Sequence, residues 1–192
     1  EPLMKLFARS ELEFDIDLMN QDLDYILTQT NWHPENNQIS LQYSNKDKED
    51  PWYSGTGKSW EEVDGKWRII LEDEEVEHLN PALKGTYIEH VLQSLSFTPI
   101  RTRLMRMSPR SCYSIHRDTS ARWHMALKTT EHARFVFTKD QAVHHIPADG
   151  HPYFVDTTKE HTAFNGDDDY RIHMVMLDLS VTVDKEYLKQ WM

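Results

Sequence analysis

Residues 111–128 read SCYSIHRDTSARWHMALK and place the triplet His116-Arg-Asp118 between two segments of strand-like composition. We expect strands at 112–116 and 122–128. At the end of a strand, residues two apart leave the same face, so the imidazole of His116 and the carboxylate of Asp118 point the same way. About one His-x-Asp triplet is expected by chance in a chain of this composition. The triplet therefore gains meaning only from the residues that accompany it.

Two of those residues, His161 and Arg171, lie further along the chain. His161 follows Asp118 by 43 residues and completes a set of two histidines and one carboxylate. Such a set leaves three positions open on an octahedral ion and is typical of non-haem Fe(II) oxygenases. Arg171 comes ten residues after His161, far enough for a strand to end, turn and return. Its planar guanidinium suits a carboxylate bound beside a metal. The spacing predicts a metal site at His116, Asp118 and His161.

Two predicted strands carry basic side chains on a face shared with small or apolar ones. Arg122 and His124 share one face, and Arg171 and His173 share another. A guanidinium that points inward needs a partner, and a bound dicarboxylate would provide one. The alternative is that Arg122 and Arg171 face solvent while Trp123 packs inward. His173 is ambiguous, and one reading gives it an orienting role behind the groups that bind.

Near residue 100 the sequence pattern changes from helices with a few strands to a series of short strands. Before it, helical spacing predicts a helix at 17–30, and Asn80-Pro81 begins a second one that runs to about residue 95. Strands are expected there at 39–43 and 67–71. After it, turn signals such as Asn165-Gly166 separate about eight short strands. These strands are predicted at 101–107, 112–116, 122–128, 133–138, 142–146, 152–156, 161–164 and 171–179.

This pattern predicts a mainly β protein with supporting N-terminal helices, folded as a double-stranded β-helix, that is, a jelly-roll or cupin-like fold. We expect one domain over 1–192. Residues 1–99 would supply helical and strand support, 100–180 the β-helix core, and 181–192 a C-terminal tail with a short helix. Residues 44–58 are interpreted as a surface loop, with a lid as the alternative.

Composition limits the partners and the location. A net charge of −11 argues against a nucleic-acid-binding surface, because phosphate contacts need clustered Lys and Arg. No run approaches 18 apolar residues, so we expect no association with a membrane. Cys112 is the only cysteine, which excludes an intrachain disulfide and favours a cytoplasmic location. The oligomeric state is left open.

The chain resembles the Fe(II)/2-oxoglutarate-dependent dioxygenases, and more narrowly their aspartyl/asparaginyl β-hydroxylase-like branch. The resemblance lies in His116-Arg-Asp118, in Arg122-Trp-His124-Met-Ala-Leu127, and in His161 with Arg171 ten residues later; nothing before residue 98 contributes. That branch characteristically has Gly where Asp118 stands, so Asp118 completes the triad of the wider superfamily.

The resemblance implies a role for each of these residues. His116, Asp118 and His161 would bind Fe(II). Arg171 would bind the C5 carboxylate of 2-oxoglutarate, and His124 would also contact this cosubstrate. Arg122 would meet an anionic substrate.

The implied activity is hydroxylation of a C–H bond in a carboxylate-bearing substrate, with consumption of O₂ and release of succinate and CO₂. The substrate would be a small molecule such as an amino acid, or an Asp/Asn-type side chain of a polypeptide. Three alternatives remain. A non-catalytic cupin-like module would bind a metal or small anion without producing succinate. A zinc hydrolase or isomerase would use the same ligands but would give Arg171 no role. An interaction domain would bind no stoichiometric metal.

Overall fold

The computed structural model describes residues 5–47 and 50–185. The chain forms two compact units. The first, called the β unit, comprises residues 1–16 and 106–192, and the second, called the mixed unit, comprises residues 17–105. Among the described residues, no helix is long and apolar enough to cross a bilayer.

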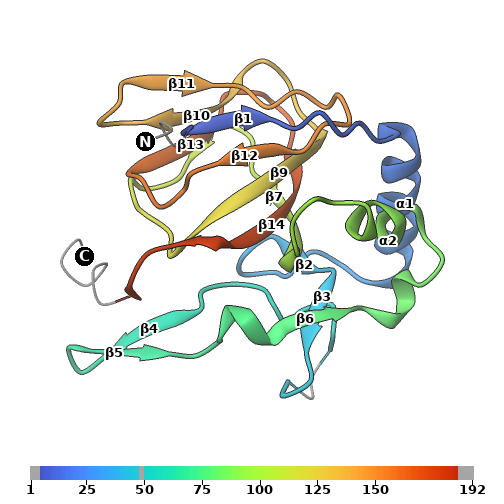
Figure 1. The fold of residues 1–192 in the computed structure, drawn as a ribbon, viewed down its shortest axis with the longest axis horizontal. Helices are drawn as coiled ribbons and strands as arrows, with labels where there is room; N and C mark the ends of the chain where they lie inside the picture. Colours follow the sequence, from blue (N-terminus) through green and yellow to red (C-terminus); the bar gives the residue numbers. More distant parts are fainter. Residues whose placement is uncertain (1–4, 48–49, 186–192) are drawn as a thin grey trace. The chain divides into compact units, whose positions relative to one another are not determined.

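The mixed unit combines helices with short antiparallel strand pairs. Its elements are α1 (Ile16–Gln29), β2 (Gln38–Ser40), β3 (Gln42–Ser44), β4 (Trp60–Val63), β5 (Lys66–Ile69), η1 (Asp73–Glu75), β6 (Val76–Leu79), η2 (Pro81–Leu83), α2 (Tyr87–Gln93) and β7 (Ile100–Met107), whose last residues belong to the β unit. Strand β2 pairs with β7, β3 with β6 and β4 with β5 (Figure 1). Helix α1 buries Met19, Leu23 and Ile26 at helical spacing, which confirms the helix predicted at 17–30.

The second predicted helix is wrong in extent. Asn80 does cap a helix, since its Oδ1 accepts from Ala82 N at 3.0 Å, but this helix is only the single turn η2. Gly85 then adopts a φ of 81°, which no continuing helix allows. Thr86 starts α2 afresh: its Oγ1 accepts from Glu89 N at 3.3 Å, and the Glu89 carboxylate accepts from Gly85 N in return. This reciprocal capping marks the start of a separate helix at Tyr87.

The loop predicted at 44–58 is anchored where the structure describes it. Ser40 N donates to the carbonyl of Trp52 at 2.7 Å, and Gly55 N donates to Ser40 Oγ at 2.6 Å. The Trp52 side chain is buried. These contacts favour a packed surface excursion over a lid for the described residues 44–47 and 50–58.

The β unit consists of two antiparallel sheets. One has the order β1-β12-β9-β14 and the other β11-β10-β13-β8 (Figure 1). The strands are β1 (Phe7–Arg9), β8 (Ser111–Cys112), β9 (Ser120–Lys128), β10 (Ala133–Phe137), β11 (Ala142–His144), β12 (Tyr153–Val155), β13 (His161–Asn165) and β14 (Arg171–Thr182). Side chains from both sheets form one buried cluster: Ala126, Phe135, Phe137, Ile146, Tyr153, Val155 and Ala163. Two sheets that share a core confirm the predicted jelly roll.

The predicted strands after residue 100 each overlap an observed one. The largest difference is at 112–116, where β8 ends at Cys112 and only an isolated bridge joins His116 to His161. Between them the chain bends so that the His116 ring bonds to the carbonyl of Ser114, at 2.7 Å. The helix predicted in the tail lies, from residue 186 on, outside the described residues. The division of the chain into support, core and tail stays a prediction.

Candidate functional site

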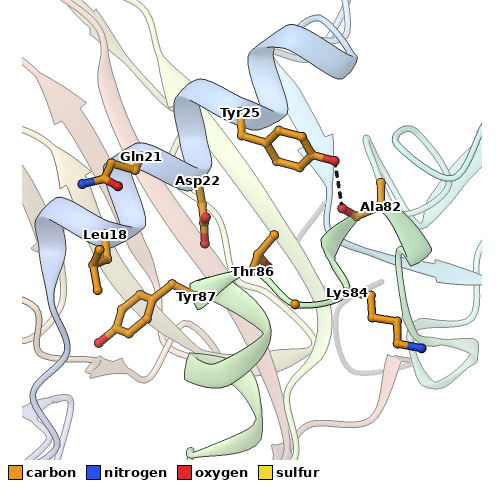
Figure 2. A pocket seen from close by; sticks show the side chains of 9 residues that line it. Leu18, Gln21, Asp22, Tyr25, Ala82, Lys84, Thr86 and Tyr87 are labelled. Carbon is orange, nitrogen blue, oxygen red and sulfur yellow. Dashed lines mark hydrogen bonds between the residues drawn. The ribbon is translucent and has the colours of Figure 1, made fainter.

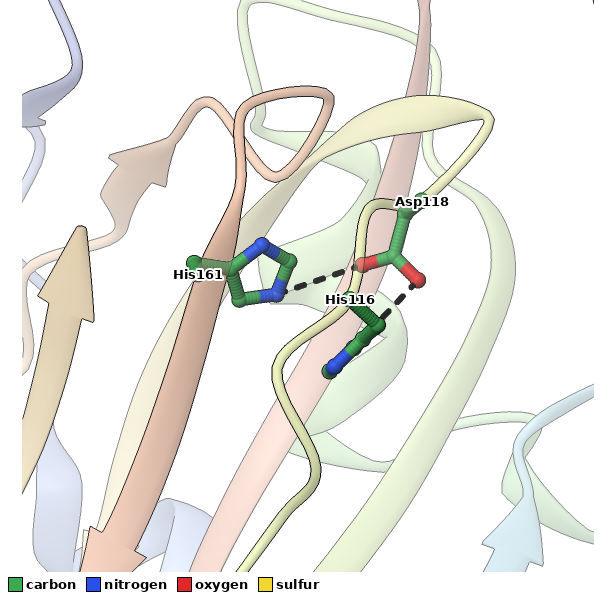
Figure 3. A group of neighbouring side chains, drawn as sticks. All are labelled: His116, Asp118 and His161. Carbon is green, nitrogen blue, oxygen red and sulfur yellow. Dashed lines mark ion pairs between the residues drawn. The ribbon is translucent and has the colours of Figure 1, made fainter. Parts of the chain in front are cut away.

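The β unit brings His116, Asp118 and His161 together (Figure 3). His161 begins β13, and its backbone exchanges two hydrogen bonds of 3.0 Å with the backbone of His116. Asp118 N donates to the carbonyl of Thr157 at 2.8 Å, and this bond holds the segment 116–118 to the loop before β13. One ligand atom from each of the three side chains lies within 4.8 Å of the others. Backbone bonds therefore bring His116 and Asp118 together with His161, which follows Asp118 by 43 residues.

Each histidine of this cluster is oriented by its own backbone. His116 Nδ1 lies 2.7 Å from the carbonyl of Ser114, and His161 Nδ1 lies 2.8 Å from the carbonyl of Lys159. A carbonyl only accepts, so each Nδ1 carries the proton and donates it. In the neutral rings both Nε2 atoms are then free to coordinate a metal. They lie 3.9 Å and 3.7 Å from the carboxylate oxygens of Asp118.

The two oxygens of Asp118 have different surroundings. Oδ1 accepts from Arg122 Nη2 at 2.8 Å. Oδ2 is buried and has no hydrogen-bond partner among the described residues. Burial alone would raise the pKa of Asp118, but the nearby Arg122, His161, His116 and Thr157 side chains outweigh it and lower the pKa. Asp118 is thus an ionised carboxylate with one oxygen held and the other available to a cation.

The electrostatics of His161 also favour metal binding. Burial lowers the pKa of its imidazole, and His116 contributes in the same direction, while Asp118 opposes them. A lowered pKa keeps the ring neutral, and only a neutral imidazole can coordinate a metal.

Arg122 lies against Asp118, the carboxylate of the cluster. Its side chain is 19% exposed, so it does not face solvent freely. Nη2 is engaged by Asp118, whereas Nε is buried without a hydrogen-bond partner among the described residues. The predicted contact with an anionic substrate would therefore have to use the remaining part of this guanidinium.

Arg171, the first residue of β14, is a buried cation that forms no ion pair with a carboxylate in the described part of the chain. The residue is 4% exposed, and its Nε has no hydrogen-bond partner there. Burial lowers the pKa of its guanidinium, and the neighbouring Tyr113 raises it. This placement excludes the solvent-facing alternative for Arg171. A buried guanidinium without a carboxylate is costly, so the site suits an anionic ligand.

The other predicted cosubstrate residue, His124, is buried beside His173. Their Nδ1 atoms lie 3.1 Å apart, and the rings meet edge to face. Strand β9 pairs with β14, where His124 lies opposite Val175 and His173 opposite Ala126. Strand alternation placed each histidine on a face, but only the register of the two strands brings them into contact. The sequence alone did not predict this pair.

A pocket in the mixed unit lies far from these groups in the sequence (Figure 2). It has a volume of about 410 Å³. Its polar groups tie α1 to η2 and to the first turn of α2: Tyr25 Oη donates to the Ala82 carbonyl at 3.2 Å, and Asp22 Oδ2 accepts from Ile88 N at 2.7 Å. The lining residues are Leu18, Gln21, Asp22, Tyr25, Ala82, Lys84, Gly85, Thr86 and Tyr87. These hydrogen bonds hold helices together and give Tyr25 and Asp22 a structural role. The candidate site is therefore the cluster in the β unit.

Three solved structures are similar to this chain over most of its length. A 2OG-Fe(II) oxygenase family oxidoreductase from Burkholderia pseudomallei matches 90% of this chain and 83% of its own, with 12% identity and a TM-score of 0.52. A viral collagen prolyl hydroxylase from Paramecium bursaria Chlorella virus-1 matches 91% and 96%, with 12% identity and a TM-score of 0.48. A Pseudomonas putida prolyl-4-hydroxylase matches 91% and 93%, with the same identity and TM-score. The likeness to the Burkholderia protein shows the jelly-roll fold of the 2-oxoglutarate oxygenases.

The family follows from the sequence match. The model of the family described as Aspartyl/Asparaginyl beta-hydroxylase matches residues 13–180. The chain belongs to this family and is an Fe(II)- and 2-oxoglutarate-dependent hydroxylase that uses O₂. The match begins at residue 13, so the expectation that nothing before residue 98 contributes is wrong. The short helices and strands of the mixed unit carry no motif that could have revealed this. No curated protein sequence matches the chain.

Proposed function

We propose that His116, Asp118 and His161 are the iron ligands of this hydroxylase, and that Arg171 and His124 bind 2-oxoglutarate. One observation carries the first part. Both ring Nδ1 atoms are bonded to backbone carbonyls, which leaves both Nε2 atoms free beside a carboxylate oxygen that has no hydrogen-bond partner among the described residues. Such backbone bonds to the distal nitrogen are characteristic of metal-binding histidines.

The donor set fits ferrous iron. Two imidazoles and one carboxylate oxygen occupy three positions of an octahedron and leave three for other ligands. When bound, Fe(II) with 2-oxoglutarate and O₂ supplies the oxidation of a substrate C–H bond, with release of succinate and CO₂. Arg122 contributes by holding Asp118 Oδ1, which orients Oδ2. The protein thus presents a single carboxylate oxygen rather than two.

Arg171 supports the assignment of the cosubstrate site. Its guanidinium matches a carboxylate in shape and charge, and the described residues supply none. His124 lies on β9 next to β14, the strand that begins with Arg171. A dicarboxylate that spans these strands would meet the Arg171 guanidinium and the His124 imidazole.

For the substrate we propose a carboxylate-bearing molecule, either a free amino acid or an Asp/Asn-type side chain of a polypeptide. The His116 side chain is 36% exposed, against 4% for His161, so the approach to the proposed iron lies on the His116 side. The buried Nε of Arg122 is a donor still available to an anion there. A screen of amino acids and Asp- or Asn-containing peptides by succinate release tests this; stimulation only by uncharged substrates would contradict it.

We further propose that nucleic acids and membranes are not partners and that the protein is cytoplasmic. The net charge of −11 repels phosphate backbones and anionic lipids alike. The single exposed cysteine, Cys112, fits a reducing compartment. Retention of the protein on heparin or on anionic vesicles at physiological salt would contradict this part of the proposal.

The decisive experiment is an anaerobic titration with Fe(II) and 2-oxoglutarate, followed by visible absorbance. We expect a charge-transfer band in the wild type, because 2-oxoglutarate chelates the iron, and none in His161→Ala. His132→Ala is the matched control, since His132 is an exposed histidine of the same unit. A band of full strength in His161→Ala would remove His161 from the ligand set, and no band in the wild type would overturn the proposal.

A further inference from the structure

We propose that His173 is a positioning residue for the cosubstrate: it donates its Nδ1 proton to Nδ1 of His124 and so holds the proton of His124 on Nε2. The inference rests on the proposed function, in that His124 is taken to donate a hydrogen bond to a carboxylate of 2-oxoglutarate. It goes beyond that function by giving a role to an imidazole that touches neither the proposed iron ligands nor the cosubstrate.

The geometry of the pair requires a single shared proton. The two Nδ1 atoms are 3.1 Å apart, and both side chains are buried. At this distance one nitrogen donates and the other accepts, because two protonated nitrogens would repel each other. The contact therefore couples the two rings: the nitrogen that carries the proton in one ring decides where the proton lies in the other.

Only one of the two arrangements suits a carboxylate ligand. If His173 donates, a neutral His124 carries its proton on Nε2 and can donate it onward to an anion. If His124 donates instead, its Nε2 is a bare lone pair that would repel a carboxylate. Since Nδ1 of His124 is engaged by His173, Nε2 is the only nitrogen left for a ligand.

The surroundings of His173 keep its ring neutral. It lies two residues from Arg171 on the same strand, and the basic side chains that act on it are Arg171, His124 and His145. Burial lowers the pKa of His173 well below the ordinary value, with further lowering by these three basic groups. Its Nε2 is buried and has no hydrogen-bond partner among the described residues. A neutral His173 that carries its proton on Nδ1 can donate a hydrogen bond to Nδ1 of His124, as the proposal requires.

The main test compares two substitutions at the same position, His173→Asn and His173→Leu. The Asn side chain keeps an N–H donor close to the place of Nδ1, whereas Leu fills similar space without one. We expect the dissociation constant of 2-oxoglutarate to rise roughly 10- to 100-fold in His173→Leu, the range for a lost hydrogen bond to a charged group. His173→Asn should stay within about threefold of the wild type, as expected when one donor replaces another. Isothermal titration with 2-oxoglutarate on Fe(II)-loaded protein under anaerobic conditions measures both.

A second measurement reads the tautomer directly, without turnover. Long-range ¹H–¹⁵N correlation spectra of the metal-free protein distinguish the two nitrogens of each imidazole, and His124→Gln identifies the signals of His124. We expect a protonated Nε2 and an unprotonated Nδ1 on His124 in the wild type. In His173→Leu this preference should be lost.

The outcomes separate this inference from the proposed function. Unchanged 2-oxoglutarate affinity in His173→Leu, equal loss in the Asn and Leu variants, or a His124 protonated on both nitrogens would overturn the role of His173. Arg171→Met serves as the reference, because its failure to weaken 2-oxoglutarate binding would overturn the cosubstrate site itself. Iron affinity and thermal stability, measured in parallel, show whether His173→Leu is folded.

Discussion

Two buried arginines, one in each unit, have opposite surroundings. Arg101 in the mixed unit is 3% exposed, and its guanidinium bonds to Gly55 O at 2.8 Å, to Asp73 Oδ1 at 3.0 Å and to Gly57 O at 2.6 Å. Arg171 in the β unit is 4% exposed, and no carboxylate is paired with it among the described residues. Burial is the same in both places, and the hydrogen bonding differs.

We propose that the difference separates a structural cation, Arg101, from a cation that binds a ligand, Arg171. The bonds of Arg101 hold the loop around Gly55 and Gly57 to η1, and they hold Arg101 itself at a φ of 50°, a conformation that costs about 1–3 kcal/mol in a non-glycine residue. Arg171 stabilises nothing in this way, because its charge is buried without compensation. A buried charge that the fold leaves unpaired is a better indicator of a binding site than burial alone.

The largest expected effect is on stability, at Arg101. Arg101→Ala removes three hydrogen bonds and leaves the buried carboxylate of Asp73 without its partner. We expect the free energy of unfolding to fall by about 3–5 kcal/mol, as for other broken buried pairs. Urea denaturation measures the change, with the exposed Lys84→Ala as a control. A loss below about 1 kcal/mol would mean that the Arg101 contacts are not structural.

The opposite pattern is expected at Arg171. Arg171→Met removes an uncompensated buried charge, so the free energy of unfolding should stay within about 1 kcal/mol or rise. The dissociation constant of 2-oxoglutarate should increase about 100-fold or more, because the lost bonds join two full charges. Urea denaturation and titration calorimetry on the same preparation test the two halves. A stability loss as large as that of Arg101→Ala, with unchanged 2-oxoglutarate affinity, would erase the contrast between the two arginines.

A third arginine, Arg122, lies between these extremes, because it is paired but pairs with a proposed metal ligand. Arg122→Leu frees Asp118 Oδ1 and should weaken Fe(II) binding by about 10-fold, within the range for residues that orient metal ligands. Arg110→Leu is the matched control, since Arg110 forms an exposed ion pair with Asp168 in the same unit. Competition with a metal indicator measures both. Equal metal affinity in the wild type and Arg122→Leu would show that the pair does not orient Asp118.

The smallest effect concerns Tyr153, a buried polar group of the β unit that is fully paired. Its Oη donates to Asp149 Oδ2 at 2.7 Å. Tyr153→Phe should lower the free energy of unfolding by about 1 kcal/mol at pH 8. The result shows whether hydrogen bonding, rather than the unit, decides which buried polar groups are structural.

The same residue gives a prediction on pH. Burial and Asp149 raise the pKa of Tyr153 from 10.0 to about 12. A pKa raised in the folded state adds stability that is fully present below pH 10 and is lost as the pH rises from 10 through 12. The gap between the wild type and Tyr153→Phe should therefore narrow over that interval in urea denaturation. A constant gap would mean that the phenol titrates alike in folded and unfolded protein.

Much of the site could be predicted because its signals are local. His116 and Asp118 lie two residues apart and both reach the cluster, although His116 forms only an isolated bridge and Asp118 lies outside the described strands. Ten residues carry the chain from His161 at the start of β13 to Arg171 at the start of β14. The jelly roll followed from short strands and turn residues in the same way. The extent predicted for the second helix was wrong because a positive φ at Gly85 interrupts a pattern that is otherwise periodic.

Side-chain contacts between segments could not be predicted from local sequence patterns. The His124–His173 pair depends on a register in which β9 and β14 are offset by an irregularity at Ile172 and His173. The bond from Arg122 to Asp118 depends on how the chain turns between the two residues, and four residues of sequence allow many turns. Only the tertiary structure shows these two contacts, since no periodicity in the sequence encodes them.

By itself, the sequence determined the short strands and predicted the chemical set that we propose for the site: two imidazoles and a carboxylate for a metal, and a distal arginine for an anion. These features depend on residue type and covalent spacing, which are local. The tertiary structure decided which nitrogens of His116 and His161 are free, which oxygen of Asp118 is held, and that Arg171 is buried without a carboxylate beside it. Such features depend on which groups distant in the chain reach hydrogen-bonding distance, and only the packing of the two sheets fixes that.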